Sequence, residues 1–154
     1  MSSFLKRPGA QKGVTLIEVL AALVIISIGL LGIASLQANS LKLNQSSYMR
    51  SQATELAYEI VERMRANRDQ ARLGNYDLAL TAAPPGGATV IAQDQAAWIT
   101  EIVRVLPNGQ GQIASAQVTA GPPPLRRIVV TIQWQDDRTV AGAATQQFQF
   151  TTEL

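Results

Sequence analysis

Glu18 is the only charged side chain in the apolar stretch of residues 14–36. A carboxylate at the centre of a bilayer is costly, so a membrane helix tolerates it near an end or beside an opposite charge. If the chain is cut between Gly13 and Val14, the new α-amine lies four residues before Glu18. Groups at that separation lie on one face of a helix, so the two charges can pair within one chain or between neighbouring chains. The alternative is a glutamate at the helix end whose carboxylate reaches the lipid headgroups.

The side chains of most hydrolytic and metal-dependent sites are missing from this chain. It contains neither histidine nor cysteine, which removes the commonest general base, the commonest metal ligand and the most nucleophilic side chain. Asp136 and Asp137 have no base or phosphate-binding loop beside them in the sequence. We therefore expect no enzyme activity, no catalytic residue, no metal site and no cofactor.

The apolar stretch must hold Glu18 in place, and its length suits a membrane. Residues 19–36 carry no charge, close to the ~20 residues that cross a bilayer core as a helix. Lys6, Arg7 and Lys12 come before the stretch, and positive charge marks the cytoplasmic side. The stretch is too long for an ordinary secretory signal, although a cut near Ala34 is the alternative. The sequence predicts a single-pass protein with a cytoplasmic N-terminus and an exported body.

Those basic residues also determine the overall charge. The chain has a formal net charge of +2 and a pI near 9.3, which on its own hints at an acidic partner. Three of the 13 basic residues and none of the 11 acidic ones precede residue 14, so the remainder has a formal charge of −1. The basic pI is therefore no indication of nucleic-acid binding.

The run Lys12-Gly13-Val14-Thr15-Leu16-Ile17-Glu18 resembles the class III signal of type IV prepilins and pseudopilins. The resemblance implies that a prepilin peptidase and N-methyltransferase cuts after Gly13 and methylates Val14. It also implies that Glu18 orders the docking of subunits. One position departs from the pattern of the signal, and one feature of the helix departs from major pilins, which commonly carry a proline near the end of its membrane half. Most relatives have phenylalanine in place of Val14, and this chain lacks a proline between Pro8 and Pro84.

Gly29 and Gly32 are the candidates for loosening the membrane helix in place of that proline, because glycine lowers helix propensity. The alternative is that these small residues allow close packing of helices.

Beyond residue 36 the apolar residues recur at helical spacing, and no glycine or proline interrupts residues 33–73. One helix is predicted over residues 15–72, with Gly74 as its stop and with ion pairs Glu59–Arg63 and Arg65–Asp69. Its predicted core stripe is Leu41, Tyr48, Ala53, Leu56, Ala57, Ile60 and Met64. The expected organisation is a leader (1–13), a transmembrane helix half (14–36), an amphipathic half (37–73) and a periplasmic head (74–154).

The head is predicted to combine a short helix with a sheet. Residues 74–93 are rich in glycine, proline and alanine and indicate a surface loop, and residues 94–106 indicate a helix capped by Asp94, with Trp98 in the core. Alternating patterns predict strands at 112–120, 128–134 and 145–152, with breaks at 121–124 and around 136–138. The predicted fold class is α+β and type IV pilin-like: a long N-terminal helix packed on a small antiparallel sheet.

A run of arginines between Arg63 and Arg68 invites a nucleic-acid interpretation. Acidic residues interleave with the arginines and no aromatic stacking residues accompany them, so a solvated helix end is favoured and nucleic acid is not an expected partner.

Within the family, the body most resembles PilV minor pilins, also called type IV pilus modification proteins. That resemblance lies in residues 63–68, in Trp98 ahead of residues 106–111, and in Gln133-Trp134. It implies a minor pilin that helps to prime pilus assembly and supports twitching motility or adhesion. Its N-terminal helix would contact other minor pilins and the major pilin, first in the inner membrane and then in the pilus at the cell surface. The alternatives are a type II secretion pseudopilin and a pilus-borne adhesive or DNA-binding module.

Overall fold

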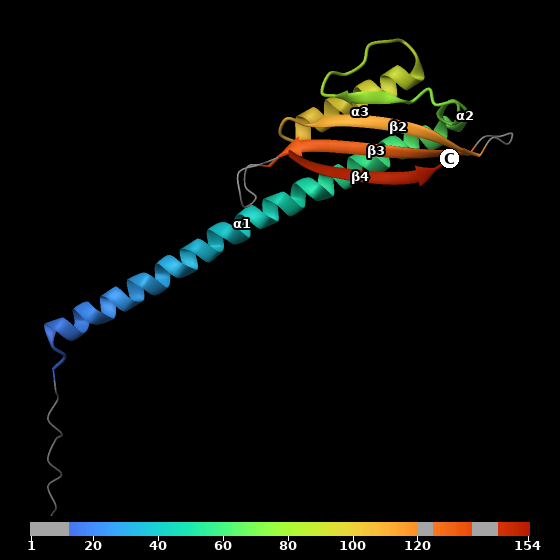
Figure 1. Cartoon of the computed structure of the whole chain (residues 1–154). Coiled ribbons are helices and arrows are strands. Elements are labelled where there is room, and N and C mark those ends of the chain that lie inside the picture. Colours follow the sequence, from blue (N-terminus) through green and yellow to red (C-terminus); the bar gives the residue numbers. More distant parts are fainter. Residues whose placement is uncertain (1–12, 120–124, 137–144) are drawn as a thin grey trace, which may run out of the picture. The chain divides into compact units, whose positions relative to one another are not determined.

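The computed structural model describes residues 13–119, 125–136 and 145–154. The chain divides into two compact units, Met1–Ser40 and Leu41–Leu154. Figure 1 shows its elements: α1 (Leu16–Ala66), α2 (Arg68–Arg72), β1 (Leu78–Thr81), α3 (Val90–Val105), β2 (Gln110–Thr119), β3 (Leu125–Gln135) and β4 (Thr145–Glu153).

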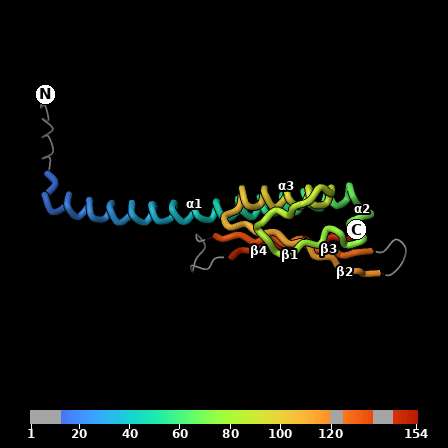
Figure 2. Tube along the Cα trace, turned by 90° about the horizontal axis from the view of Figure 1, so that it is seen from above, coloured from blue at the N-terminus to red at the C-terminus, as the bar shows by residue number. Residues whose placement is uncertain are grey.

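The four strands form one antiparallel sheet in the order β1-β2-β3-β4, so each strand pairs with its neighbour in sequence. In Figure 2, α3 and the part of α1 after residue 41 lie on the same side of this sheet. The arrangement confirms the predicted α+β class, a long helix packed on a small antiparallel sheet.

Alternation along β3 places its apolar side chains in the core. Ile128, Val130, Ile132 and Trp134 are all buried, as their spacing predicts. Trp98 of α3 is also buried, and its Nε1 donates a hydrogen bond of 2.9 Å to the carbonyl oxygen of Leu56 in α1. The core therefore joins both helices to the sheet.

The predicted stripe of α1 is correct in its second part only. Ala53, Leu56, Ala57, Ile60 and Met64 are buried, whereas Leu41 and Tyr48 are 64% and 63% exposed. The buried residues of α1 begin at Met49. The spacing of the stripe is right, but among the described residues no side chain of α1 before Met49 is buried.

The predicted single helix is interrupted at Asn67, between α1 and α2. The Asn67 side chain donates a hydrogen bond of 3.2 Å to the hydroxyl of Tyr76, and such side-chain contacts favour departures from helical geometry. Because the helix breaks there, the predicted Arg65–Asp69 pair is wrong, and Arg65 pairs with Glu62 instead.

The predicted stop at Gly74 and the pair Glu59–Arg63 are both present. Gly74 has a φ of +82°, a left-handed conformation that glycine adopts without the Cβ clash of other residues.

The segment of residues 74–93, predicted as a loop, contains β1, which pairs with β2. Four residues are too few for a clear alternating pattern. The following helix begins at Val90 and not at Asp94, because Thr89 is its cap and accepts a hydrogen bond of 3.2 Å from the amide of Ala92. The predicted break at 121–124 and the turn residues 137 and 138 lie outside the described residues, as does the leader before Gly13.

Candidate functional site

The helix that carries Glu18 begins two residues after Val14. Gly13, Val14 and Thr15 are not helical, and α1 starts at Leu16. The Thr15 carbonyl oxygen accepts from the amides of Glu18 (3.1 Å) and Val19 (3.2 Å), and the Thr15 hydroxyl oxygen lies 3.4 Å from the Glu18 amide nitrogen. Thr15 is therefore the N-cap of α1, and Glu18 is the third residue of its first turn.

Thr15 and Glu18 together form the spacing of a capping box, a threonine followed three residues later by a glutamate. Sequence reasoning had assigned neither Thr15 nor this spacing a role, although the pattern is readable without a structure. The bond between Gly13 and Val14 lies outside the helix. Gly13 is exposed, and a Cβ placed on it would meet nothing within 4 Å.

The side chains after Glu18 form an apolar surface that is open all round the helix. All residues from 13 to 45 are exposed, with Leu16 at 84% and Leu31 at 71%. Ser27 satisfies its hydroxyl within the helix, donating 2.7 Å to the carbonyl oxygen of Leu23. Between Glu18 and residue 34, Ser27 is the only side chain with a polar group, and its hydroxyl is already hydrogen-bonded. This part of α1 therefore has no polar side chain that needs water.

Gly29 and Gly32 lie within this helix, and neither has a positive φ. A Cβ at either position would meet nothing within 4 Å. By length and composition, α1 is the one helix among the described residues that could cross a membrane.

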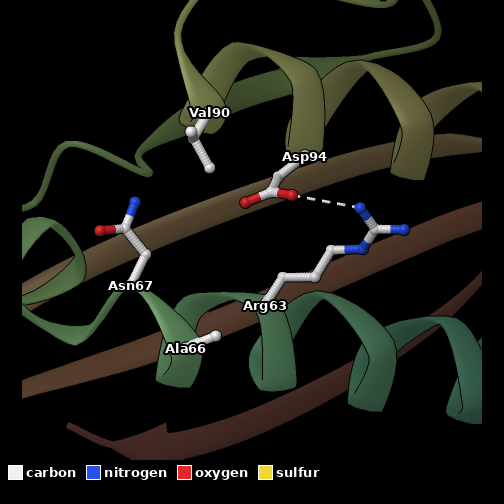
Figure 3. A pocket seen from close by; sticks show the side chains of 5 residues that line it. All are labelled: Arg63, Ala66, Asn67, Val90 and Asp94. Carbon is white, nitrogen blue, oxygen red and sulfur yellow. Dashed lines mark hydrogen bonds and ion pairs between the residues drawn. The ribbon is translucent and has the colours of Figure 1, made fainter.

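A second cluster of chemically active side chains lies in the head, between α1 and α3 (Figure 3). Arg63 donates to Glu59 at 2.7 Å and to Asp94 at 3.1 Å. The other Asp94 oxygen accepts 2.8 Å from the hydroxyl of Tyr76, which in turn accepts from Asn67. Asp94, predicted as a helix cap, therefore links α3 to α1 and to the segment before β1.

Burial raises the pKa of the Tyr76 hydroxyl, and the hydrogen bond that it donates to Asp94 raises that pKa further. The hydrogen bond to Glu59 is the main reason that the pKa of Arg63 is also raised. Both shifts keep the protons that the cluster uses as hydrogen-bond donors. Both groups are protonated at neutral pH already, and the shifts favour the same protonated forms at higher pH.

This cluster borders a shallow hollow of about 390 Å³. Its lining residues are Arg63, Ala66, Asn67, Val90 and Asp94. The charged groups in it are paired with one another. No group of three or more His, Cys, Asp or Glu side chains that could hold a metal occurs in the described parts of the chain. The geometry indicates a structural connection between α1 and α3.

Of the predicted site residues, Gly13, Val14 and Glu18 lie at the start of α1, and Gly29 and Gly32 lie further along the same helix. Sequence reasoning did not find the Tyr76–Asp94 contact, because the two residues are 18 positions apart and belong to different elements.

A family model described as the prokaryotic N-terminal methylation motif matches residues 9–34. A comparison with the curated proteins and a comparison with the solved structures each gave no match. The matched range contains the Gly13–Val14 bond, Glu18 and both helix glycines. This prepilin-type signal implies processing by a prepilin peptidase and assembly with other pilins, and proteins that carry it are structural. Together with the apolar helix α1, which begins within the matched range, the motif indicates a type IV pilin-like or pseudopilin-like protein.

Proposed function

We propose that this chain is a minor pilin of the PilV kind that primes assembly of a type IV pilus near its tip. In this proposal it is inserted in the inner membrane with its head in the periplasm, cut after Gly13 and methylated at Val14. It then enters the filament at the cell surface, where it supports twitching motility or adhesion. The observation that carries the proposal is the methylation motif at the start of an exposed apolar helix.

The assembly step follows from the apolar surface of α1. Helices leave lipid for contacts with other helices at little change in hydrophobic free energy, so the apolar side chains cannot set the register between subunits. A carboxylate buried without a partner in such a bundle is strongly disfavoured. Glu18 therefore supplies the register if an amine from a pilin subunit meets it.

The position of Val14 favours pairing between chains. Val14 precedes α1 in the uncut chain, so helical geometry does not hold its amine on the same face as the Glu18 carboxylate. The proposed partner of Glu18 is therefore the N-terminal amine of a neighbouring subunit, which is either another minor pilin or the major pilin.

The test compares Glu18→Ala with Glu55→Ala, since both glutamates are exposed on α1. Each variant is expressed in the piliated host from which the natural gene has been deleted. Intact mass of the membrane-extracted protein should show a start at Val14 with one added methyl group in both variants. Glu18→Ala should be depleted at least about tenfold from sheared filaments, and Glu55→Ala should be present as in the wild type. Wild-type incorporation of Glu18→Ala would contradict the docking role.

Processing is tested separately with Gly13→Asp, which should leave the leader attached and the protein in the membrane. A product that still begins at Val14 would contradict the assigned cleavage site. The deletion strain separates the two systems that use this signal. Loss of pili and twitching supports the minor pilin, whereas loss of exoprotein release with normal pili would replace it with a secretion pseudopilin.

A further inference from the structure

The face of the sheet that points away from the helices carries an array of side-chain amides. Side chains alternate between the two faces of a sheet. Because Ile132 and Phe148 pack on the core, their neighbours Gln133 and Gln147 face away from it. The register places Gln110 opposite Gln133 and Gln133 opposite Gln147, so three amides form a row across β2, β3 and β4. The same face carries five more uncharged polar residues: Gln112, Thr131, Gln135, Thr145 and Gln149.

This amide face is hollowed at one end, where β2 begins, β3 ends and β4 begins. The hollow has a volume of about 270 Å³, just below the roughly 300–1,000 Å³ of pockets that hold drug-sized ligands. It therefore suits one small chemical unit. Its lining residues, none of them charged, are Asn108, Gln110, Gln133, Trp134, Gln135 and Thr145.

The turn before β2 brings the Asn108 amide beside that of Gln135. The backbone amide of Gln135 donates a hydrogen bond of 2.8 Å to the carbonyl oxygen of Pro107, which ties this turn to the end of β3. Asn108 follows with a φ of +50°, a conformation that asparagine tolerates better than most residues. Its side-chain amide donates to the side-chain oxygen of Gln135. The two amides are therefore held in place before any ligand binds.

The amides of the hollow keep hydrogen-bonding capacity for a ligand. A side-chain amide has two N–H donors and an oxygen with two lone pairs. The contact between Asn108 and Gln135 uses one donor and one lone pair, and so does the 3.4 Å contact from Gln133 to Gln147. Each amide presents a donor and an acceptor side by side. Neighbouring hydroxyls of a sugar ring match that combination, because every hydroxyl both donates and accepts.

We propose that this hollow binds one ring of a neutral saccharide. The four amides of Asn108, Gln110, Gln133 and Gln135 hydrogen-bond the ring hydroxyls, and the Thr145 hydroxyl adds a fifth polar contact. The site is made of side chains of the head alone, so it depends neither on Glu18 nor on the proposed pilus role.

The chemistry of the lining excludes other classes of ligand. A phosphate or another anion would meet no lysine or arginine among the lining residues, and a divalent cation would meet no carboxylate. An apolar ligand would take the amides out of water without replacing their hydrogen bonds, which is unfavourable. A neutral ligand rich in hydroxyl groups avoids each of these costs.

A second copy of this chain is the other occupant to consider. Contact between copies about a two-fold axis brings the same surface of each copy together, and two concave surfaces leave a void between them. Interfaces between copies also take much of their affinity from an apolar centre, whereas amides and a hydroxyl surround this hollow. Its shape and its polarity therefore favour a small polar ligand.

The experiment uses the full-length protein in lipid nanodiscs and an array of oligosaccharides that end in neutral hexoses, neutral N-acetylhexosamines or acidic sugars. The protein should bind neutral members of the array in preference to acidic ones, and empty nanodiscs should bind none. The best neutral oligosaccharide is then titrated by calorimetry beside its monodeoxy analogues at the terminal ring. At least one analogue should bind about tenfold more weakly, because it leaves an amide of the hollow without a partner.

Two glutamines of the same face form a matched pair of variants. Gln133→Ala removes an amide from the hollow, whereas Gln149→Ala removes one from the same face outside it. Gln133→Ala should weaken saccharide binding about tenfold or more, and Gln149→Ala should bind as the wild type does. Gln135 is exposed, so Gln135→Ala repeats the test in a folded head if Gln133→Ala disturbs the sheet.

Absence of binding to every neutral oligosaccharide would overturn the proposal, and so would a preference for acidic ones. Equal losses in Gln133→Ala and Gln149→Ala would place the binding outside the hollow. Self-association that Gln133→Ala abolishes, with no saccharide bound, would assign the face to a second copy. Glu18→Ala leaves the hollow intact and should bind saccharide normally, so failure of this site and failure of the assembly role can be told apart.

Discussion

The two units of this protein differ in whether their apolar side chains are exposed or buried. In the first, Leu16, Ile25 and Leu31 are at least 70% exposed. In the second, Trp98, Ile60 and Ile132 have no exposed surface at all. The head supplies its own interior, whereas the N-terminal helix takes its surroundings from lipid or from other chains.

This difference separates stability from assembly. A side chain of the head affects whether the head folds, because its neighbours belong to the same chain. A side chain of the first unit affects what the protein associates with, because its neighbours are supplied from outside. Substitutions of the same type should therefore have different consequences in the two units.

The largest difference is expected between Trp98→Ala and Leu23→Ala. Removal of the buried indole leaves a cavity and frees the Leu56 carbonyl oxygen, so the head should lose about 3–5 kcal/mol of unfolding free energy. Leu23 is 55% exposed, and its replacement should not change that value. Urea unfolding of the full-length protein in detergent, followed by tryptophan fluorescence, to which Trp134 contributes in both variants, measures both. Equal losses of unfolding free energy in the two variants would contradict the assignment of stability to the head alone.

The effect of a glycine-to-alanine change on stability should also have opposite signs in the two units. A Cβ at Gly109 would lie 2.7 Å from the carbonyl oxygen of Ile102, so Gly109→Ala should cost the head about 1–3 kcal/mol. Gly29 has open space around it, and Gly29→Ala should leave the head unchanged and stabilise α1 by up to about 1 kcal/mol. Head unfolding by urea and helix content by circular dichroism measure these effects. A wild-type head in Gly109→Ala would show that the loop can move to admit the methyl group.

Tyr76→Phe should have a smaller effect, about 1 kcal/mol at neutral pH, because Asp94 keeps its ion pair with Arg63. The pH dependence is more specific. The native pKa of Tyr76 is raised, so its contribution is complete below the unfolded pKa of about 10 and is lost as the pH rises through the native pKa. The unfolding free energy of the wild type should fall more steeply than that of Tyr76→Phe at alkaline pH. Parallel curves would exclude Tyr76 as the group responsible.

The smallest effect is expected for Arg104→Ala on the exposed face of α3. Arg104 is paired with Glu101, three residues away, but both lie at the surface, where water screens the interaction. The urea midpoint of the head should match that of the wild type. A clear decrease would mean that the exposed face of α3 contributes to stability in a way that its surface position does not indicate.

Local patterns predicted the parts of the fold that depend on local spacing. The stripe from Ala53 to Met64 and the alternation of β3 were both correct, because burial in each follows the period of a single element. Leu41 and Tyr48 continue the same stripe, yet they are exposed. Their burial depends on how far the head extends along α1, which no spacing within the helix records.

Contacts between segments that are distant in the sequence could not be predicted from residue spacing either. Asp94 has the residue type of a cap, but Arg63 and Tyr76 take its carboxylate once α3 packs on α1. At the start of α1, by contrast, the contact is local and the sequence spacing does indicate it. Thr15 and Glu18 are three residues apart, and their capping geometry could have been predicted with the site itself.

The cap at Thr15 gives the Glu18 carboxylate a further role once the chain is cut. The aligned peptide dipoles of a helix place partial positive charge at its N-terminus, where an added cation is unfavourable and an anion is favourable. Cleavage after Gly13 would put a new ammonium group two residues before the first helical residue, next to this positive end. Glu18 lies in the first turn. Its negative charge therefore interacts favourably with both the ammonium group and the positive end of the helix dipole. The whole cap lies on the retained side of the bond, and α1 would therefore keep its beginning when the leader is removed.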